Sequence, residues 1–216
     1  MKSKIIYLLI IFLVLDLATL IYAVLYGGYP PYLPGGGDPT SYRILYIHVP
    51  IAWIMYFSFT VGLVASILYL WRNNVKYDVV AFKGITLGVI YGVPAIVTGM
   101  LWANEVWGSP WNWDPRQTST LVLLLAYVGY LALRASIPDV DRARVVSSAY
   151  SVAAYVTLPI SYVSAILFRS LHEQLPGQPI SGDMVVILVI RVFVAFILYL
   201  TILYIYYKSG LSGGGE

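Results

Sequence analysis

Six long apolar runs, each able to cross a lipid bilayer as a helix, set the strongest limit on how this chain can fold. They span residues 5–26, 44–71, 84–103, 117–133, 145–168 and 184–207. A helix that crosses the hydrocarbon core needs about 20 residues, and these runs lack the alternation of membrane-barrel strands. Only 11% of the residues are charged, against about 25% in soluble domains. The sequence therefore predicts an all-α integral membrane protein, a single bundle of six transmembrane helices over residues 1–208.

The two ends of the chain have different sequence character. The first run follows two lysines but is too long for the core of a signal peptide, so we expect a retained helix with Asp16 facing the bundle. The glycine-rich residues 209–216 are expected to form a flexible tail.

Positive charges are distributed unequally between the two ends of the predicted helices. Nine lie on the side of the N-terminus: Lys2, Lys4, Arg72, Lys76, Lys83, Arg134, Arg142, Arg144 and Lys208. Three lie on the other side: Arg43, Arg116 and Arg169. The positive-inside rule then predicts a multi-pass protein of the cell (plasma) membrane with both termini cytoplasmic. The net charge of +3 is mostly a topology signal, and no basic stripe suited to nucleic acid is present.

A tryptophan-rich connection joins the third and fourth predicted helices over residues 104–118, on the predicted outer face. Four of the six tryptophans lie in the twelve residues from Trp102 to Trp113. Indole rings favour the membrane–water interface, so some tryptophans belong to an ordinary aromatic belt; Trp53 and Trp71 are interpreted this way. The crowding of Trp107, Trp111 and Trp113 with Gly108, Pro110 and Pro115, beside Asp114 and Arg116, instead favours a surface for a flat, partly charged ligand.

The two histidines, His48 and His172, are both predicted to lie at this outer face. Two imidazoles can bind haem iron from opposite sides of the macrocycle, indoles can cover its faces, and Arg43 or Arg116 can pair with a propionate. The chain has no cysteine, so a haem would be held without a thioether bond, as haem b. A blander interpretation treats the histidines as interfacial residues and Asp114–Arg116 as a surface ion pair, which contributes at most about 1 kcal/mol.

Other polar and helix-bending residues lie inside the predicted helices. Arg191 must face the bundle, water or a partner, or reach a lipid headgroup. Asp16 is its candidate counter-ion only if the depths match; counting from the helix ends places Asp16 midway and Arg191 nearer the outer face, which disfavours the pair. Pro94 and Pro159 are expected to bend their helices.

Three separated motifs resemble the CcmC family, the haem-handling membrane proteins of cytochrome c maturation within the group named for its WWD loop. They are WGSPWNWDPRQTS at 107–119, RILYIHVPIAW at 43–53 and LPISYVSAILFRSLHE at 158–173. The resemblance implies that His48 and His172 are axial haem ligands. It further implies that the loop serves haem binding and chaperone contact through Trp107, Gly108, Trp111, Trp113, Asp114 and Arg116.

The resemblance also implies partners and a role. The protein would deliver haem to a chaperone of the CcmE type, beside ABC-transporter subunits of the CcmA and CcmB type and a small single-span CcmD-type subunit. In this role it would be a haem-transfer protein and not an enzyme.

Three loop residues depart from the family pattern, and two other functions stay open. Pro110 stands where tryptophan is frequent, and Pro115 and Gln117 make the string WDPRQT similar to that of the cytochrome c synthase branch. One alternative is therefore a synthase-like haem ligase. The other is a solute transporter, which needs polar groups near the bilayer midplane; Asp16 and Arg191 are the candidates for these.

Overall fold

The computed structural model describes residues 2–33, 37–172 and 180–212, and in these ranges it contains helices and no strand. The helices are α1 (Lys2–Tyr26), a short 3₁₀ helix η1 (Pro39–Ile44), α2 (Leu45–Arg72), α3 (Val75–Trp107), α4 (Pro115–Ser136), α5 (Val140–Ala154), α6 (Thr157–Leu167) and α7 (Gly182–Ser212). They make six segments long and apolar enough to span a membrane, α5 and α6 together forming one of them. The predicted all-α, six-span architecture is confirmed.

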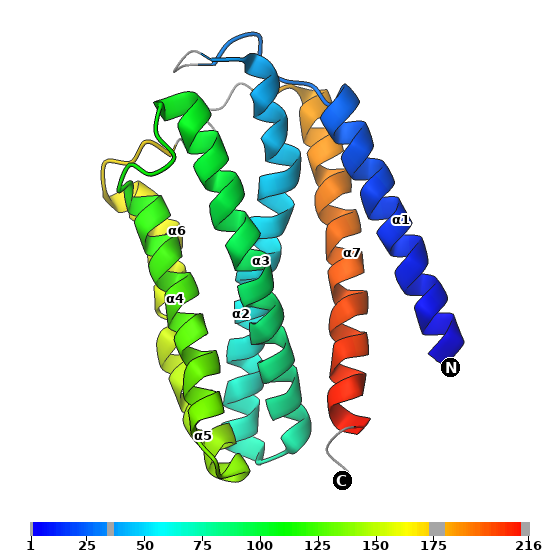
Figure 1. The fold of residues 1–216 in the computed structure, drawn as a ribbon, viewed down its shortest axis with the longest axis vertical. Helices are drawn as coiled ribbons and strands as arrows, with labels where there is room; N and C mark the ends of the chain where they lie inside the picture. The colour runs from blue at the N-terminus through cyan, green and yellow to red at the C-terminus, as the bar shows by residue number, and fades with distance from the viewer. Residues whose placement is uncertain (1, 34–36, 173–179, 213–216) are drawn as a thin grey trace.

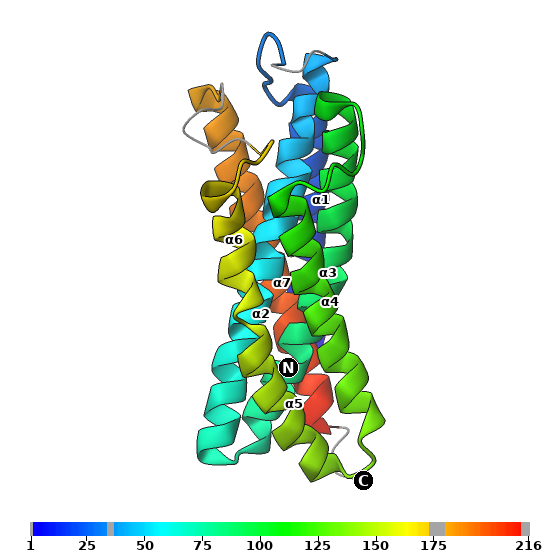
Figure 2. The same ribbon diagram turned by 90° about the vertical axis from the view of Figure 1, so that its left-hand side faces the viewer.

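The helices run along one long axis, with α2 and α3 at the centre of the bundle (Figures 1 and 2). Helices α4, α5 and α6 lie on one side of this pair, and α7 followed by α1 lies on the other (Figure 1). We call the end that carries η1, residues 108–114 and residues 168–172 the loop end, and the end with the turns at 73–74 and 137–139 the opposite end. Helix α1 begins and α7 ends toward the opposite end (Figure 1).

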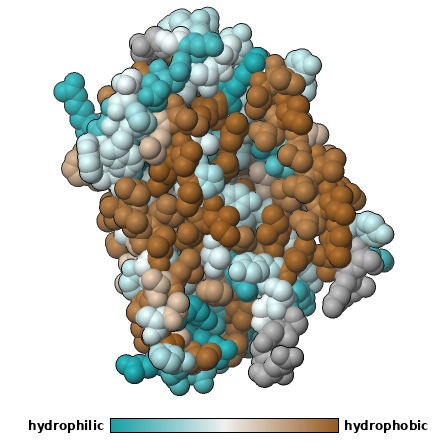
Figure 3. Space-filling model, viewed as in Figure 1, coloured by the Kyte–Doolittle hydropathy of each residue, from teal (hydrophilic) through white to brown (hydrophobic). Residues whose placement is uncertain are grey.

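An apolar belt surrounds the middle of the molecule. In Figure 3 the hydrophobic residues form a broad band between more hydrophilic ends. Exposed aliphatic side chains are numerous on α1, where Leu8, Ile11 and Val14 are each about half exposed. Such a surface is what a bilayer solvates, so the chain is a multi-pass membrane protein.

Close packing of α2 on α3 forms the centre of the bundle. A Cβ atom on Gly88 would lie only 2.5 Å from Cε1 of Phe59, so the two helices approach more closely than a larger residue allows. Phe59 in turn stacks on Tyr127 of α4. Helices in lipid lack a hydrophobic driving force for association, and small residues at such crossings allow the close packing that holds the helices together.

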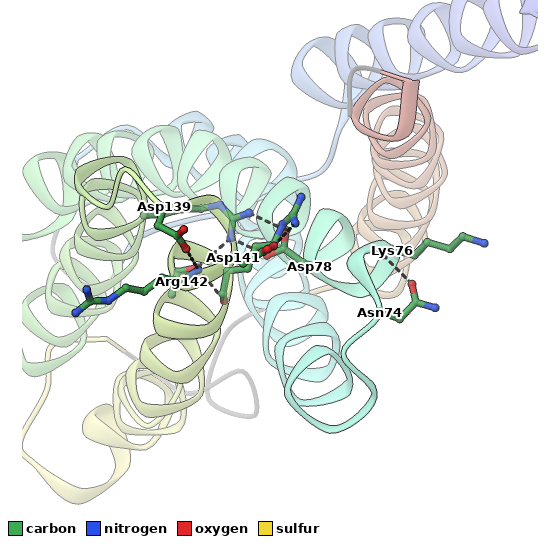
Figure 4. A network of polar contacts seen from close by, with 9 residues as sticks. Asn74, Lys76, Asp78, Asp139, Asp141 and Arg142 are labelled. Carbon is green, nitrogen blue, oxygen red and sulfur yellow. Dashed lines mark hydrogen bonds and ion pairs between the residues drawn. The ribbon is translucent and has the colours of Figure 1, made fainter. Parts of the chain in front are cut away.

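Most of the observed helices extend beyond the apolar runs that predicted them, and α2 has the length of its run. Helix α3 begins at Val75 and not at 84, after Asn74, whose side chain accepts a hydrogen bond from the Lys76 amide. Its first turns carry the buried Asp78, which receives two hydrogen bonds of 2.7 Å from Arg134 and an ion pair from Arg144 at 3.4 Å (Figure 4). An apolar run excludes these charged residues. The helix can include them because the carboxylate of Asp78 is paired with the two arginines.

The last two predicted helices and the tail also differ from the prediction. The run at 145–168 is divided at Tyr155–Val156, just before Pro159. Pro159 has no amide hydrogen to give the Tyr155 carbonyl, and that carbonyl accepts instead from the Leu158 amide at 3.0 Å. At the other end of the chain, α7 continues through Ser212, so residues 209–212 of the predicted tail are helical, and 213–216 lie outside the described residues.

The disfavoured pairing of Asp16 with Arg191 is present, and that expectation was wrong. Arg191 Nη1 lies 2.7 Å from Asp16 Oδ1. Helix α7 begins at Gly182, two residues before the predicted start, so Arg191 lies nine residues, or about 14 Å, from its loop end. Asp16 lies ten residues, or about 15 Å, from the loop end of α1. The depths therefore match.

Candidate functional site at the loop end

His48 lies in the second turn of α2, partly buried, with its ring held by α3. Its Nδ1 atom is 2.9 Å from Oγ1 of Thr98. The Thr98 hydroxyl donates its single proton back to the helix, to the Pro94 carbonyl at 2.7 Å. A hydroxyl has one proton, so its oxygen accepts from Nδ1–H of His48. This tautomer leaves Nε2 of His48 with a free lone pair, the arrangement that imidazole ligands of metals adopt.

The tryptophan loop itself is short and ordered by its own polar groups. It runs from Gly108, which ends α3 with φ +72°, to Asp114, which caps α4. The positive φ at Gly108 is a conformation that side-chain-bearing residues rarely adopt. Gln117 of α4 accepts from the Asn112 amide at 3.1 Å and donates to the Pro110 carbonyl at 3.3 Å. These two bonds hold the middle of the loop against the start of α4.

The four clustered tryptophans divide into different environments. Trp102 packs edge-on against Tyr42 with 5.3 Å between ring centroids and belongs to a core cluster. Trp107 ends α3 and is partly buried. Trp111 and Trp113 meet edge-to-face, with centroids 5.9 Å apart.

Trp113 is the most unusual residue of the loop. It is 76% exposed and has φ +52°, a left-handed conformation that costs a non-glycine residue about 1–3 kcal/mol. A large aromatic held in a strained conformation and presented to the surroundings is typical of a ligand- or partner-binding position.

Asp114 is the structural centre of the site. Only 3% of its surface is exposed, and Oδ1 accepts from the amides of Arg116 and Gln117 at the start of α4. Oδ2 accepts from the Ser170 hydroxyl and from the Leu171 amide, both at 2.7 Å. No ion pair joins its carboxylate to the Arg116 guanidinium in the described part of the chain, so the surface-pair interpretation was wrong. Asp114 instead fastens the tryptophan loop to the segment that carries His172.

His172 follows directly from this anchor. Its main-chain amide donates to the Ser170 hydroxyl at 3.0 Å, the same hydroxyl that donates to Asp114. Burial first, and the positive charge of Arg116 second, lower the pKa of the His172 imidazole to about 4, against the opposing effect of the Asp114 carboxylate. The imidazole is therefore neutral at neutral pH and able to act as a ligand.

The two predicted propionate partners have different surroundings. Arg116 lies over the Tyr162 ring, 5.2 Å from its centroid, and donates to the Tyr162 carbonyl at 3.2 Å. Arg43 donates to the carbonyls of Gly27 and Val24, at 2.8 and 3.0 Å, and thereby caps the end of α1. These contacts place the Arg116 side chain against α6, and they tie Arg43 to the end of α1.

A groove opens beside the tryptophan loop, between α4 and α6. Its volume is about 420 Å³, and it is lined by Trp113, Pro115, Thr118, Ser119, Val122, Thr157, Ile160, Ser164 and Phe168. A hydrogen bond of 2.9 Å between Ser119 and Ser164 joins the two helices within it. Neither His48 nor His172 lines this groove, so the groove is distinct from a site between the two histidines.

Comparison with known proteins assigns the chain to a family. The sequence model of the CcmC family, described as Heme exporter protein C, matches residues 3–210. The chain belongs to the CcmC family. Among its relatives, Heme exporter protein C of Bradyrhizobium diazoefficiens is 33% identical over 142 residues, which are 65% of this chain and 54% of the relative. The protein of the same name from Escherichia coli strain K12 is 36% identical over 134 residues, 62% of this chain and 54% of the relative. The chain thus spans little more than half the length of these relatives.

The family prediction made from three motifs is therefore confirmed, while several residues of this CcmC-family site had no sequence signal that we recognised. Thr98 and Ser170 act through hydrogen bonds to His48 and Asp114, residues 50 and 56 positions away. Gln117 was noted only as a departure from the family pattern, yet it holds the loop. An isolated Thr or Ser in an apolar run does not reveal such a partner, because the contact exists only after the helices pack.

Proposed function

We propose that this CcmC-family protein binds haem b without a covalent bond at its loop end, and hands it to a CcmE-type haem chaperone for c-type cytochrome biogenesis. The observation that carries the proposal is that His48, whose ring Thr98 holds, and His172, which Ser170 connects to Asp114, lie at the same end of the bundle as the tryptophan loop. Relatives that carry the name Heme exporter protein C support a role in haem handling.

The residues present fit the chemistry of haem. When bound, haem supplies an iron with two axial positions that imidazoles can fill. Nε2 of His48 is free because Thr98 occupies Nδ1, and His172 is kept neutral by its surroundings. Trp111 and Trp113 offer the aromatic surface, with Trp107 and Gly108 setting the start of the loop and Asp114 holding it in place.

The propionates need cationic partners, and Arg116 is the stronger candidate. Its guanidinium lies over the Tyr162 ring, and a guanidinium can bind a propionate with a forked hydrogen-bond geometry. Arg43 is the weaker candidate because its described hydrogen bonds cap α1.

We also propose an orientation and a set of partners. With nine cationic residues toward the opposite end and three toward the loop end, the loop end faces outward from the plasma membrane and the opposite end faces the cytoplasm. Membership of the family supports CcmA- and CcmB-type transporter subunits and a CcmD-type subunit as further partners within the bilayer.

The experiment is an absorption spectrum of the purified full-length protein, oxidised and reduced, beside the His48→Ala and His172→Ala variants. Asn104→Ala, an exposed change at the loop end, is the control. We expect a low-spin b-type spectrum in the unaltered protein and the control, and its loss or conversion to a high-spin spectrum in each histidine variant. A colourless protein that also fails to bind added haemin would overturn the proposal.

The transfer role, without bond-making chemistry, requires a second measurement. Mixing the haem-loaded protein with a soluble CcmE-type domain should move haem to that domain, as seen by separating the two on a column. Formation of thioether-linked haem on an apocytochrome with this chain alone would instead show a ligase and would contradict the assignment as a non-enzymatic transfer protein.

A further inference from the structure

Pro50 leaves a main-chain carbonyl without its usual partner on the turn of α2 that carries His48. In a helix the carbonyl of residue 46 accepts from the amide of residue 50, and proline has no amide hydrogen. The carbonyl of Tyr46 is thus freed, two residues before His48. Inside a bilayer an unsatisfied carbonyl is costly, and it also loosens the turn that contains it.

Arg191 of α7 supplies a hydrogen-bond donor to this carbonyl. Its Nε atom donates to the Tyr46 carbonyl at 3.3 Å, and the residue is only 4% exposed. Nη1 is directed to α1, where it contacts the Asp16 carboxylate at 2.7 Å, the Asp16 carbonyl at 3.0 Å and the Thr19 hydroxyl at 2.9 Å. One guanidinium therefore ties α7, α1 and the beginning of α2 together.

Tyr46 is held at its other end as well. Its side chain is fully buried, and its hydroxyl donates to the Gly28 carbonyl at 2.9 Å. The turn before His48 thus has its backbone held by Arg191 and its side chain held by the segment after α1, while the His48 ring is held by Thr98.

We propose that Arg191 is a positioning residue for His48, acting through the carbonyl that Pro50 frees. The proposal rests on the haem-binding function given above. The Asp16 carboxylate balances the guanidinium charge, and the Asp16 carbonyl and the Thr19 hydroxyl also hold Nη1 toward α1, which leaves Nε directed at the Tyr46 carbonyl. Arg191 contacts neither histidine directly, and its effect on the site passes through the α2 backbone.

The first experiment compares two variants that differ only at residue 191, so that one of them retains the guanidinium and the other lacks it. Asp16→Asn removes the counter-ion but retains the Arg191 donor to Tyr46. The double variant Asp16→Asn/Arg191→Met removes the donor as well, without leaving an unpaired charge. Each full-length protein is titrated with haemin, and the spin state is read from the absorption spectrum. We expect Asp16→Asn to stay low-spin, and the double variant to bind haemin on the order of tenfold more weakly with a high-spin fraction, as loss of a charge-assisted hydrogen bond implies.

A rescue experiment distinguishes positioning of His48 through the Tyr46 carbonyl from a purely structural role of Arg191. Pro50→Ala restores an amide hydrogen for the Tyr46 carbonyl. Added to the double variant, it should return the low-spin spectrum and most of the lost haemin affinity. An unaltered high-spin fraction in the triple variant would overturn the proposal, as would a low-spin spectrum in the double variant itself.

A readout on the haem-free protein keeps the test independent of ligand loading. Amide hydrogen exchange of the peptide covering residues 45–52 should be on the order of tenfold faster in the double variant and slow again after Pro50→Ala. Asp78→Asn, which breaks a buried ion pair at the opposite end, is the control. It should lower overall stability without changing the spin state or exchange at 45–52.

The outcomes separate the two proposals. If the unaltered protein binds no haemin, the proposed function fails, while hydrogen exchange still decides whether Arg191 holds the turn. If the unaltered protein is low-spin and the double variant is identical to it in both measurements, the proposed function stands and the role of Arg191 is rejected. If the variants that carry Arg191→Met fail to fold, Arg191→Lys, which keeps the charge toward Asp16 but lacks the planar fork, provides the same comparison.

Discussion

His48 is held at its ring by a threonine whose hydroxyl has its own proton already committed. The bond from His48 Nδ1–H to Thr98 therefore sets both the orientation and the tautomer of the imidazole. Partners that orient a ligating histidine commonly contribute 10- to 100-fold to metal affinity, so Thr98 becomes important for haem affinity under the proposal that His48 is a ligand.

Replacing Thr98 by valine keeps the shape of the side chain and removes the acceptor. We expect haemin affinity to fall roughly 10- to 100-fold, with the protein still folded. Thr86→Val is the matched control, because the Thr86 hydroxyl on the same helix bonds the Phe82 carbonyl. Equal affinity of the Thr98 and Thr86 variants in a haemin titration would show that Thr98 does not orient His48.

The pH dependence of His172 follows from its lowered pKa. Its pKa is about 4 in the folded protein and about 6.5 in an unfolded chain. Between these values the unfolded chain binds a proton that the folded protein does not. The contribution of His172 to stability therefore falls as pH drops from 6.5 toward 4, and it is unaffected above 6.5.

A titration by ¹³C-histidine NMR in the His48→Ala background, where one imidazole remains, measures this pKa directly. We expect a midpoint well below 6, and a higher midpoint when Arg116→Gln removes the second cause of the shift. A midpoint near 6.5 in the presence of Arg116 would contradict the buried environment described for His172.

Trp113 combines a strained backbone conformation with an exposed aromatic side chain. Trp113→Gly removes the strain, so we expect the free energy of unfolding to rise by about 1 kcal/mol. Haemin affinity should fall roughly tenfold as the aromatic contact is lost. Trp71→Ala, an exposed tryptophan outside the loop, controls for loss of an interfacial indole. Unchanged affinity in Trp113→Gly would exclude the ring from the haem contact.

At the scale of the elements, helix ends decide the geometry of the site more than helix interiors do. Asp114 caps α4 and at the same time holds residues 170 and 171. One carboxylate thus couples the start of α4 to the end of α6, which are separated by a whole helical hairpin in the sequence.

Asp114→Asn replaces two acceptor oxygens by one, and should weaken both connections. We expect the free energy of unfolding to fall by about 1–3 kcal/mol, and amide exchange at residues 170–172 to accelerate. Asp139→Asn is the matched control, since Asp139 caps α5 through a single exposed bond to the Arg142 amide. If the two variants lose equal stability and leave exchange at 170–172 unchanged, Asp114 is an ordinary cap.

At the scale of the whole molecule, the loop end and the opposite end have different charge and different interactions. The opposite end is closed by the network of Asp78 with Arg134 and Arg144 (Figure 4). The loop end carries both histidines and the strained tryptophan. The proposed orientation assigns these two ends to opposite sides of the membrane.

The absence of cysteine makes that orientation directly testable. Single cysteines are introduced at two exposed positions, Pro110 in the loop and Ala135 at the opposite end. A maleimide that cannot cross membranes should label Pro110→Cys in intact spheroplasts, and should label Ala135→Cys only after lysis. The reverse pattern would invert the topology and remove the outward presentation of haem.

Much of the architecture was predictable from the sequence because the bilayer imposes a simple rule on apolar length. Six helices, both histidines on one end and the tryptophan loop beside them follow from hydropathy and from the order of the motifs. Helix ends were not predictable in the same way. The apolar run of the third helix stops at Lys83, although α3 begins at Val75 and includes the buried Asp78, which Arg134 and Arg144 neutralise.

The class of fold, the family and the candidate binding residues were predictable from the sequence, since these depend on composition, length and local motifs. The tertiary structure alone decided which polar groups meet. It brought Thr98 to His48, Ser170 to Asp114, and Arg191 to both Asp16 and the Tyr46 carbonyl. Such partners are unreadable in sequence because a buried polar group takes whichever partner packing places within hydrogen-bond distance, and that partner is set by helix depth and rotation.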